Sequence, residues 1–271
     1  PSKTGIFQSL LILMDKFLCY FATNIYPEGE GVKKDLISYR ITNKTLNAIG
    51  NGNVNGVDIN YFDPNLYSDE KNSESRSNLG IKDDDFVFIF VGRLVKDKGV
   101  NELVGAFKKL RDESNLDFDI FLLLVGDQES ILDPLKQKTL NEITNNKNIL
   151  SLGFKSDIRP YLSIANVLVL PSYREGFPNV LLQAGSMGIP SIVTDVNGCN
   201  EIILEGKNGW IIPVKDEDAI LDSMKKSMSK RNTIEIKKIN IRNRIKQKYQ
   251  QEFVWNAILK EYESLINKNF G

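Results

Sequence analysis

The sequence PSYREGFPNVLLQAGSMGIP (171–190) is the most informative about the fold, because it joins two apolar runs through a loop and a helical segment. VLVL (167–170) precedes it and SIVT (191–194) follows it, and both runs are short and rich in branched residues. Such runs are typical of strands in a parallel sheet that is covered on both faces. Pro178 suits a first helical turn, since its missing N–H would have no partner there. The stretch therefore predicts a βαβ unit whose helix begins near Asn179.

The same alternation continues outward from this unit. Helices are predicted from about Val100 to Arg111, where apolar residues recur at i, i+3 and i+4, and from about Ser156. Further strands are predicted at the apolar runs 86–91, 118–125, 149–152 and 209–212. Strands that alternate with helices predict an α/β domain with a doubly wound parallel sheet.

The residues before this alternation follow a different pattern. Leu10–Ala22 predicts a buried apolar helix that is too short to span a bilayer. A helix from about Glu30 and short strands near 24–26 and 46–49 are expected next, which is too little to close a domain.

Two polar stretches then predict an interdomain connection. The first, 51–58, is rich in Asn and Gly, and the second, 63–85, ends in the charged run Asp83–Asp85, which we expect to be solvated. At the other end, a helix is predicted from Thr233 to about Lys268.

Composition excludes several classes of function. The sequence has 35 basic and 35 acidic residues, so no net charge favours nucleic acid. It has no histidine, which excludes His-based catalytic triads and His-containing metal clusters within it. Its two cysteines, Cys19 and Cys199, form no disulfide framework, so we expect small buried thiols in a cytoplasmic protein. The DFD motif at 117–119 is interpreted as an exposed turn, and no metal site is predicted.

Two loops carry groups that suit a phosphate and a sugar. GRLVKDKG (92–99) follows a predicted strand and places Arg93 and Lys98 at the edge where parallel sheets bind ligands. Standing alone, this loop is equally well read as a solvated basic loop. The loop Glu175–Pro178 offers a carboxylate for sugar hydroxyls, and the first amides of the following helix, at Asn179 and Val180, form an anion site.

Several motifs, in order and spacing, resemble the C-terminal domain of family-4 retaining glycosyltransferases, in particular bacterial capsular and surface-polysaccharide enzymes. The resemblance runs from about Val87 to the end. It rests on GRLVKDKG (92–99), VGD (125–127), LGF (152–154), PSYREGFPNVLLQAGSMGIP (171–190) and NGCNEIILEGKNGWII (197–212).

The resemblance implies site residues at matching positions. Arg93 and Lys98 would hold the donor diphosphate, and Glu175 would hold the transferred sugar; these three are the expected catalytic residues. Position 183 is usually a second glutamate that binds the ribose, and this chain has Gln183 there. The full set expected to bind the nucleotide sugar is Gly92, Arg93, Lys98, Val125, Gly126, Asp127, Gly153, Phe154, Glu175, Gly176, Phe177, Pro178, Asn179, Val180 and Gln183, with Phe154 reading the base edge.

The resemblance also implies an organisation and an activity. We expect a GT-B arrangement in which residues 1–62 comprise the end of a truncated Rossmann-like acceptor domain and the linker, which lies near Asn51–Asp63. Residues 63–250 would bind the donor, and 251–271 would form a helix that returns toward the first domain. The expected reaction moves a hexose or N-acetylhexosamine from a nucleoside-diphosphate sugar, UDP-linked by resemblance, to a glycan or lipid-linked acceptor. No separate cofactor is expected. The expected place is the cytoplasm, at the inner membrane face where the acceptor is lipid-linked.

Two alternatives stay open at this point. A GT-B-type sugar-nucleotide epimerase shares the architecture, although its pattern includes a histidine. A nucleotide-sugar-binding module or inactive homologue is favoured slightly by Gln183.

Overall fold

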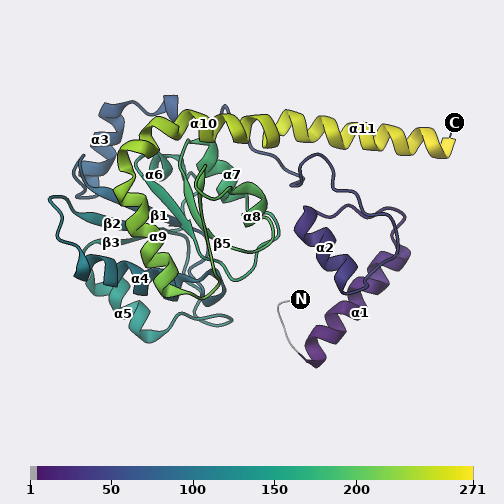
Figure 1. The fold of residues 1–271 in the computed structure, drawn as a ribbon, viewed down its shortest axis with the longest axis horizontal. Coiled ribbons are helices and arrows are strands. Elements are labelled where there is room, and N and C mark those ends of the chain that lie inside the picture. Colours follow the sequence, from purple (N-terminus) through teal and green to yellow (C-terminus); the bar gives the residue numbers. More distant parts are fainter. Residues whose placement is uncertain (1–4, 271) are drawn as a thin grey trace.

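The computed structural model describes residues 5–270, apart from the side chains of 231–237 and 269–270, so the ends of the two predicted outer segments, 1–4 and 271, lie outside it. Six parallel strands form one sheet in the order β3-β2-β1-β4-β5-β6 (Figure 1). They are β1 (Phe86–Val91), β2 (Ile120–Val125), β3 (Ile149–Gly153), β4 (Val167–Leu170), β5 (Ser191–Thr194) and β6 (Gly209–Ile212). All six predicted strands are confirmed. β2 starts later than predicted because the Asp119 N–H donates to the Asp85 carboxylate at 2.9 Å rather than to a neighbouring strand.

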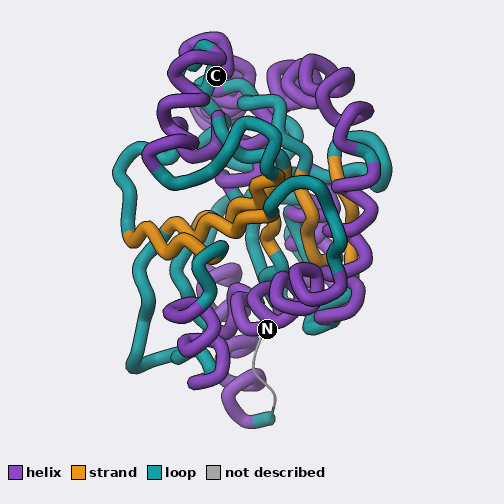
Figure 2. Tube along the Cα trace, turned by 90° about the vertical axis from the view of Figure 1, so that its left-hand side faces the viewer, coloured by secondary structure: helices purple, strands orange, loops and turns teal. Residues whose placement is uncertain are grey.

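Helices cover both faces of the sheet (Figure 2). One layer contains α4 (Val100–Glu113), α5 (Gln137–Asn145) and α9 (Glu217–Ser229), and α4 contacts the other two. The second contains α3 (Asp69–Asn78), α6 (Arg159–Ser163), α7 (Asn179–Ser186) and α10 (Arg231–Tyr249), in which α3 contacts α6 and α7 contacts α10. The short helix α8 (Cys199–Ile202) follows β5. α6 begins at Arg159 rather than near Ser156, because Asp157 accepts a hydrogen bond from the Arg159 N–H at 3.0 Å.

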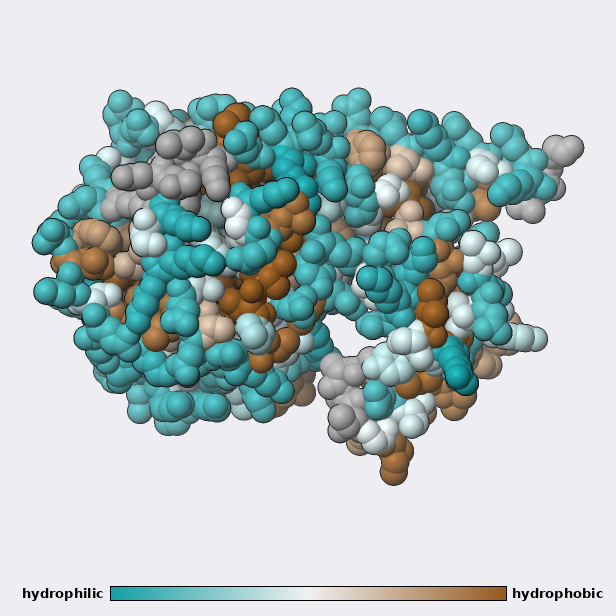
Figure 3. Space-filling model, in the orientation of Figure 1, coloured by the Kyte–Doolittle hydropathy of each residue, from teal (hydrophilic) through white to brown (hydrophobic). Residues whose placement is uncertain are grey.

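The N-terminal segment, residues 5–49, contains α1 (Ile6–Phe21) and α2 (Glu30–Ser38). The two short strands predicted there are reduced to one isolated bridge between Ile25 and Leu46. The prediction of a buried helix over Leu10–Ala22 is wrong: α1 has no buried residue, and Phe17 is 63% exposed. In Figure 3, apolar atoms gather on the surface of the lobe that α1 forms. None of the helices within residues 5–270 combines the length and apolar character that a bilayer crossing requires.

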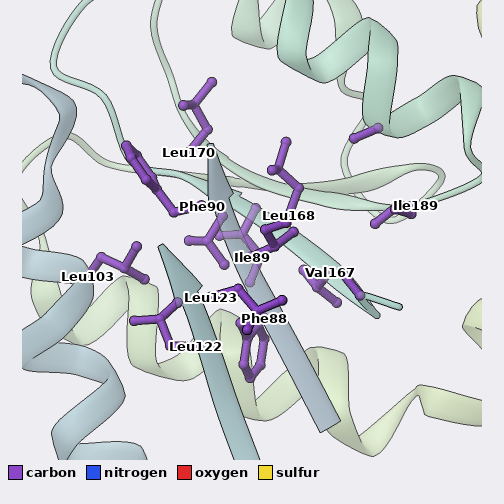
Figure 4. Close-up of a cluster of buried hydrophobic side chains, with 14 of the residues drawn as sticks. Phe88, Ile89, Phe90, Leu103, Leu122, Leu123, Val167, Leu168, Leu170 and Ile189 are labelled. Atoms are coloured by element: carbon purple, nitrogen blue, oxygen red, sulfur yellow. The ribbon is translucent and has the colours of Figure 1, made fainter. Parts of the chain in front are cut away.

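The core of the sheet domain lies between the strands and their covering helices. Phe88 and its strand neighbours point into this space beside side chains of β2 and β4 (Figure 4). The residues Phe86–Phe90 of β1 are all 0% exposed. The predicted apolar face of α4 is confirmed, because Val100, Leu103 and Phe107 are each 0% exposed. Burial of both faces explains why the strands are continuous apolar runs.

The polar stretch 63–85 is part of the sheet domain rather than an open connection. It contains α3, whose Arg76 donates a 2.6 Å hydrogen bond to the Ile164 carbonyl. The expectation that the run Asp83–Asp85 is solvated is wrong for Asp85, which is 2% exposed. Its carboxylate accepts hydrogen bonds from two backbone N–H groups, at Lys82 (2.8 Å) and Asp119 (2.9 Å).

The predicted C-terminal helix is divided into α10 and α11 (Gln251–Phe270) at Gln250, whose backbone is extended. At this break the Val57 N–H donates to the Tyr249 carbonyl at 2.8 Å, and the Gln251 N–H donates to the Val57 carbonyl at 3.1 Å. α11 then runs past the N-terminal segment (Figure 1), where the Tyr26 hydroxyl donates to Glu261 at 2.8 Å.

Candidate functional site

The candidate site lies where the strand order of the sheet reverses. From β1 the chain proceeds outward to β2 and β3, whereas β4, adjacent to β1 on its other side, starts the run to β5 and β6. In open α/β sheets, ligands bind outside the carboxyl ends of the strands at this point. The loop that begins at Gly92 follows β1, and the loop that carries Glu175 follows β4, so both reach this edge.

The Lys98 ammonium and the Glu175 carboxylate form an ion pair across the two loops. Their N–O distance is 2.6 Å, and the side chains are 25% and 11% exposed. Gly99 makes this approach feasible: its φ is +70°, and a Cβ there would lie 2.1 Å from the Pro171 carbonyl oxygen. Removing a cation and a carboxylate from water costs free energy, which is offset only if the two groups pair with each other or bind a ligand.

A buried thiol lies near this ion pair. Burial, with the nearby negative charge of Glu175, raises the pKa of the Cys199 thiol. The thiol is therefore neutral at ordinary pH and serves as packing, as expected for Cys199. Cys19, which was expected to be buried too, is only partly so, because it lies on α1.

A cavity of about 520 Å³ opens at the ends of β1, β2 and β3, and we call it the β1–β3 cavity. It is lined by seven of the residues predicted to bind the nucleotide sugar: Gly92, Arg93, Val125, Gly126, Asp127, Phe154 and Gln183. Gly153 is not among the lining residues, but its carbonyl accepts the N–H of Gly126, which is, at 2.9 Å. The Phe154 N–H already donates to Asp127 at 3.1 Å, while the Phe154 ring is 69% exposed. A base that hydrogen-bonds to Phe154 would therefore use its carbonyl or displace Asp127.

One wall of this cavity was not foreseen, because it comes from the stretch interpreted as a linker. Tyr61 lines the cavity, and the Arg159 guanidinium lies 3.4 Å from the centre of its ring. Asp157 holds that guanidinium by two hydrogen bonds of 2.7 and 2.9 Å. These bonds lower the pKa of Asp157. The result is a rigid aromatic surface beside the nucleoside-sized space.

Arg93 stands apart from the other two residues predicted to be catalytic. Its side chain is 68% exposed and pairs with Glu129 at 2.9 Å in the wall of the β1–β3 cavity. The structure thus brings Lys98 and Glu175 together and places Arg93 with the nucleoside side of the site. An exposed guanidinium on a weak surface pair can turn toward an anion at little cost.

The start of α7 faces the same edge of the sheet. A helix begins with N–H groups that have no partner inside the helix, so the first turn at Asn179 and Val180 can receive an anion. Phe177 before it is 7% exposed and packs 5.6 Å from the ring of Tyr249. The loop Gly176–Pro178 is thereby anchored to the core rather than free.

Asn53, which the sequence did not single out, fixes this loop from the linker side. It is 3% exposed, and its side-chain amide donates to the Asn179 side-chain oxygen at 2.7 Å. Its own N–H donates to the Glu28 carbonyl at 2.8 Å. Asn53 therefore connects the N-terminal segment with the start of α7, and no local signal in the sequence predicted such a contact.

The DFD motif is not gathered into a ligand cluster. Asp119 pairs with Arg111 at 2.6 Å, and this hydrogen bond lowers the pKa of the Asp119 carboxyl. Within residues 5–270, no group of three or more His, Cys, Asp or Glu side chains is arranged to hold a metal ion.

Residues 71–251 match the family model described as glycosyl transferases group 1. Over 268 residues the chain is 28% identical to a capsular polysaccharide biosynthesis glycosyltransferase, CapM, of Staphylococcus aureus, covering 98% of this chain and 68% of the relative. Over 191 residues it is 34% identical to the UDP-Gal:alpha-D-GlcNAc-diphosphoundecaprenol alpha-1,3-galactosyltransferase of Escherichia coli, covering 70% of this chain and 48% of the relative. The chain thus spans between about half and about two thirds of the length of these relatives.

Solved structures share the fold. The Anabaena protein Alr3699/HepE, solved in complex with UDP, superposes with a TM-score of 0.80 at 20% identity, covering 95% of this chain and 68% of that one. Sucrose-phosphate synthase of Thermosynechococcus elongatus gives a TM-score of 0.79 at 20% identity, covering 96% of this chain and 62% of that one. The expected GT-B type of fold is confirmed at this level.

Proposed function

Because the chain belongs to the group 1 glycosyl transferases, we propose that it carries the donor site of a retaining glycosyltransferase that builds a surface or capsular glycan. The observation that carries this proposal is the 2.6 Å Lys98–Glu175 pair at the strand-order reversal, next to the nucleoside-sized β1–β3 cavity. UDP as the nucleotide is supported by the UDP-Gal named for the Escherichia coli relative and by the UDP bound in the Anabaena protein.

The donor would lie across both loops. The nucleoside occupies the β1–β3 cavity, with its base beside Tyr61 and Phe154 and its ribose at Gln183. The diphosphate extends toward Lys98 and the first amides of α7, while Arg93 turns from Glu129 to a phosphate oxygen. Glu175 then accepts hydrogen bonds from the hydroxyls of the transferred sugar.

These groups would act on the charge that develops during transfer. When the bond between the sugar and the diphosphate breaks, negative charge grows on the leaving phosphate, and the Lys98 ammonium and the α7 amides stabilise it. Glu175 keeps Lys98 in place and orients the sugar. Because both side chains are largely buried, their effect on that charge is stronger than it would be in water.

A second candidate function is nucleotide-sugar binding without transfer, which Gln183 favours. A neutral amide can hydrogen-bond the ribose hydroxyls but offers no carboxylate. An epimerase is less well supported, since the sequence has no histidine.

Incubation with UDP-galactose, UDP-glucose and UDP-N-acetylglucosamine, each with a panel of lipid-linked acceptors, separates these functions. Transfer to an acceptor supports the proposal, exchange of the sugar epimer favours the epimerase, and UDP binding without either reaction favours the binding module. Glu175→Gln should abolish transfer. Glu129→Gln also removes one carboxylate charge, but from the exposed pair with Arg93, and it should keep most of the transfer activity.

A further inference from the structure

The carboxylate of Glu201 joins the N-terminal segment to the sheet domain. Its Oε2 accepts the Glu30 N–H at 2.8 Å and its Oε1 accepts the Gly31 N–H at 3.0 Å, both at the start of α2. The same Oε1 accepts the Gly198 N–H at 3.3 Å, at the start of its own helix α8. One side chain therefore caps two helices that lie far apart in the sequence, where a negative charge is favourable at both.

Asn197 adds a second contact to the same helix. Its side-chain amide donates to the Asp35 carboxylate on α2 at 2.8 Å. The approach is close: a Cβ on Gly31 would lie 2.4 Å from the Asn197 Oδ1, and one on Gly29 would lie 2.7 Å from the Glu201 Oε2. We refer to Asn197 and Glu201, with the α2 groups they bind, as the α2 clamp.

The α2 clamp rests directly on the loop that carries Glu175. A Cβ on Gly198 would lie 2.2 Å from the Gly176 carbonyl oxygen and 2.8 Å from the Phe177 Cα. On the other side of that loop, a Cβ on Gly176 would lie 2.9 Å from the carboxylate of Glu28. The loop is thus held between the clamp and the residues that precede α2.

The clamp also forms one side of a second cavity. This α2 cavity, of about 590 Å³, is lined by Asp35 of α2 and by Tyr39, which directly follows α2, together with Tyr173, Glu175 and Lys215 of the sheet domain. It shares no lining residue with the β1–β3 cavity. A molecule bound in it would meet the nucleotide sugar at Glu175 from the side away from the nucleoside.

Its chemistry matches a carbohydrate. Carboxylates accept hydrogen bonds from sugar hydroxyls, and tyrosine rings pack on the apolar face of a sugar. The Lys215 ammonium, which lies 4.8 Å from the centre of the Tyr173 ring, can donate hydrogen bonds to sugar oxygens. We propose that the α2 cavity binds the sugar of the acceptor and that Glu201 is a positioning residue that completes it by holding α2. This assignment rests on the function proposed above.

Amide hydrogen exchange tests the clamp without any assay of transfer. Glu201→Ala should speed exchange at least tenfold in peptides that cover residues 30–38, while peptides from β1 and β2 stay unchanged and the Kd of UDP stays within twofold. Glu201→Gln keeps one acceptor oxygen, so its exchange rate over residues 30–38 should lie between those of the parent chain and Glu201→Ala. Glu205→Ala is the matched control, because its carboxylate accepts only the Ile211 N–H and pairs with Lys226.

Gly31→Ala tests the clamp by a change in α2 rather than in Glu201. The added methyl group would displace the Asn197 side chain, although alanine has a higher helix propensity than glycine. Gly31→Ala should reproduce the faster exchange over 30–38 apart from the substituted site. Unchanged exchange in both Glu201→Ala and Gly31→Ala would overturn the clamp, whatever the outcome for transfer.

Saturation-transfer NMR with methyl α-glycosides of glucose, galactose and N-acetylglucosamine, in the presence of UDP, tests the cavity. At least one glycoside should bind the parent chain, and Tyr39→Ala and Glu201→Ala should each weaken it at least fivefold, with Glu205→Ala unchanged. No glycoside binding to the parent chain, or equal binding to all four proteins, would overturn the assignment of the cavity. If transfer is later observed, the same two variants should raise the KM for the acceptor and leave the KM for the donor unchanged.

Discussion

The sheet domain and α1 are both rich in apolar residues, yet they bury them to opposite extents. In β1, Phe88 is 0% exposed, whereas in α1 Phe17 is 63% exposed and no residue is buried. The strands of the sheet domain are covered by other apolar strands and helices that lie close to them in the sequence. Apolar character therefore predicts burial only where the surrounding sequence also provides the strands and helices that cover it.

A pair of phenylalanine truncations should separate the core of the sheet domain from α1 most clearly. Phe88→Ala should lower the free energy of unfolding by about 3–5 kcal/mol, because it leaves a cavity in a closed core. Phe17→Ala should change it by about 0.5 kcal/mol or less, as for other exposed positions. Urea unfolding followed by circular dichroism measures both, and equal losses would show that α1 is covered in solution.

The next prediction concerns ligand binding at the edge of the sheet. Lys98→Ala and Arg93→Ala should each weaken UDP binding by about 1.5–3 kcal/mol, as expected for a lost hydrogen bond between charged groups. Lys98→Ala should weaken UDP binding more than Arg93→Ala does, because it also leaves the carboxylate of Glu175, which is 11% exposed, without its partner. Uridine should bind all three proteins alike in calorimetric titrations. Equal losses for uridine and UDP would contradict the assignment of both cations to phosphate.

Two aspartates, the buried Asp85 and the exposed Asp117, should likewise differ in how much they contribute to stability. Asp85→Ala should lower the free energy of unfolding by about 1–3 kcal/mol, because two backbone N–H groups lose their buried acceptor. Asp117→Ala is the control: this residue is exposed, so its loss should change stability by no more than about 0.5 kcal/mol. Thermal or urea unfolding of the pair decides whether the run Asp83–Asp85 is a structural part of the sheet domain.

The smallest expected effect is at Gln183. Gln183→Glu should preserve UDP binding or tighten it by about 1 kcal/mol, because an ionised acceptor strengthens a hydrogen bond to the ribose. The gain should disappear with 2′-deoxy-UDP. If binding is lost while the fold is intact, Gln183 packs against the wall of the β1–β3 cavity and does not contact the ribose.

Much of the sheet domain could be predicted because its signals are local. Each strand is a continuous apolar run, and the loops after β1 and β4 carry their charged residues within a few positions of the strand end. The pairing of Lys98 with Glu175 follows from topology once the two strands are recognised as neighbours.

The remaining features depend on contacts between distant segments, which a single sequence does not encode in a local pattern. Asp85 looks like its exposed neighbour Asp84 in sequence and differs only in facing Asp119. Asn53 reads as a turn residue, and its bond to Asn179 appears only in three dimensions. Glu201 lies at the start of its own helix, but its bonds to Glu30 and Gly31 reach a helix that the sequence does not associate with it.

The two crossings between the N-terminal segment and the sheet domain lie side by side. Val57, where the chain enters the sheet domain, is hydrogen-bonded to the backbone at Tyr249 and Gln251, where it leaves again. These backbone bonds hold the two crossings together at one place, whereas the α2 clamp joins the same two parts of the molecule through side chains. If the α2 clamp were released, the N-terminal segment would still be joined to the sheet domain through Val57 and through the bonds of Asn53 to Glu28 and Asn179.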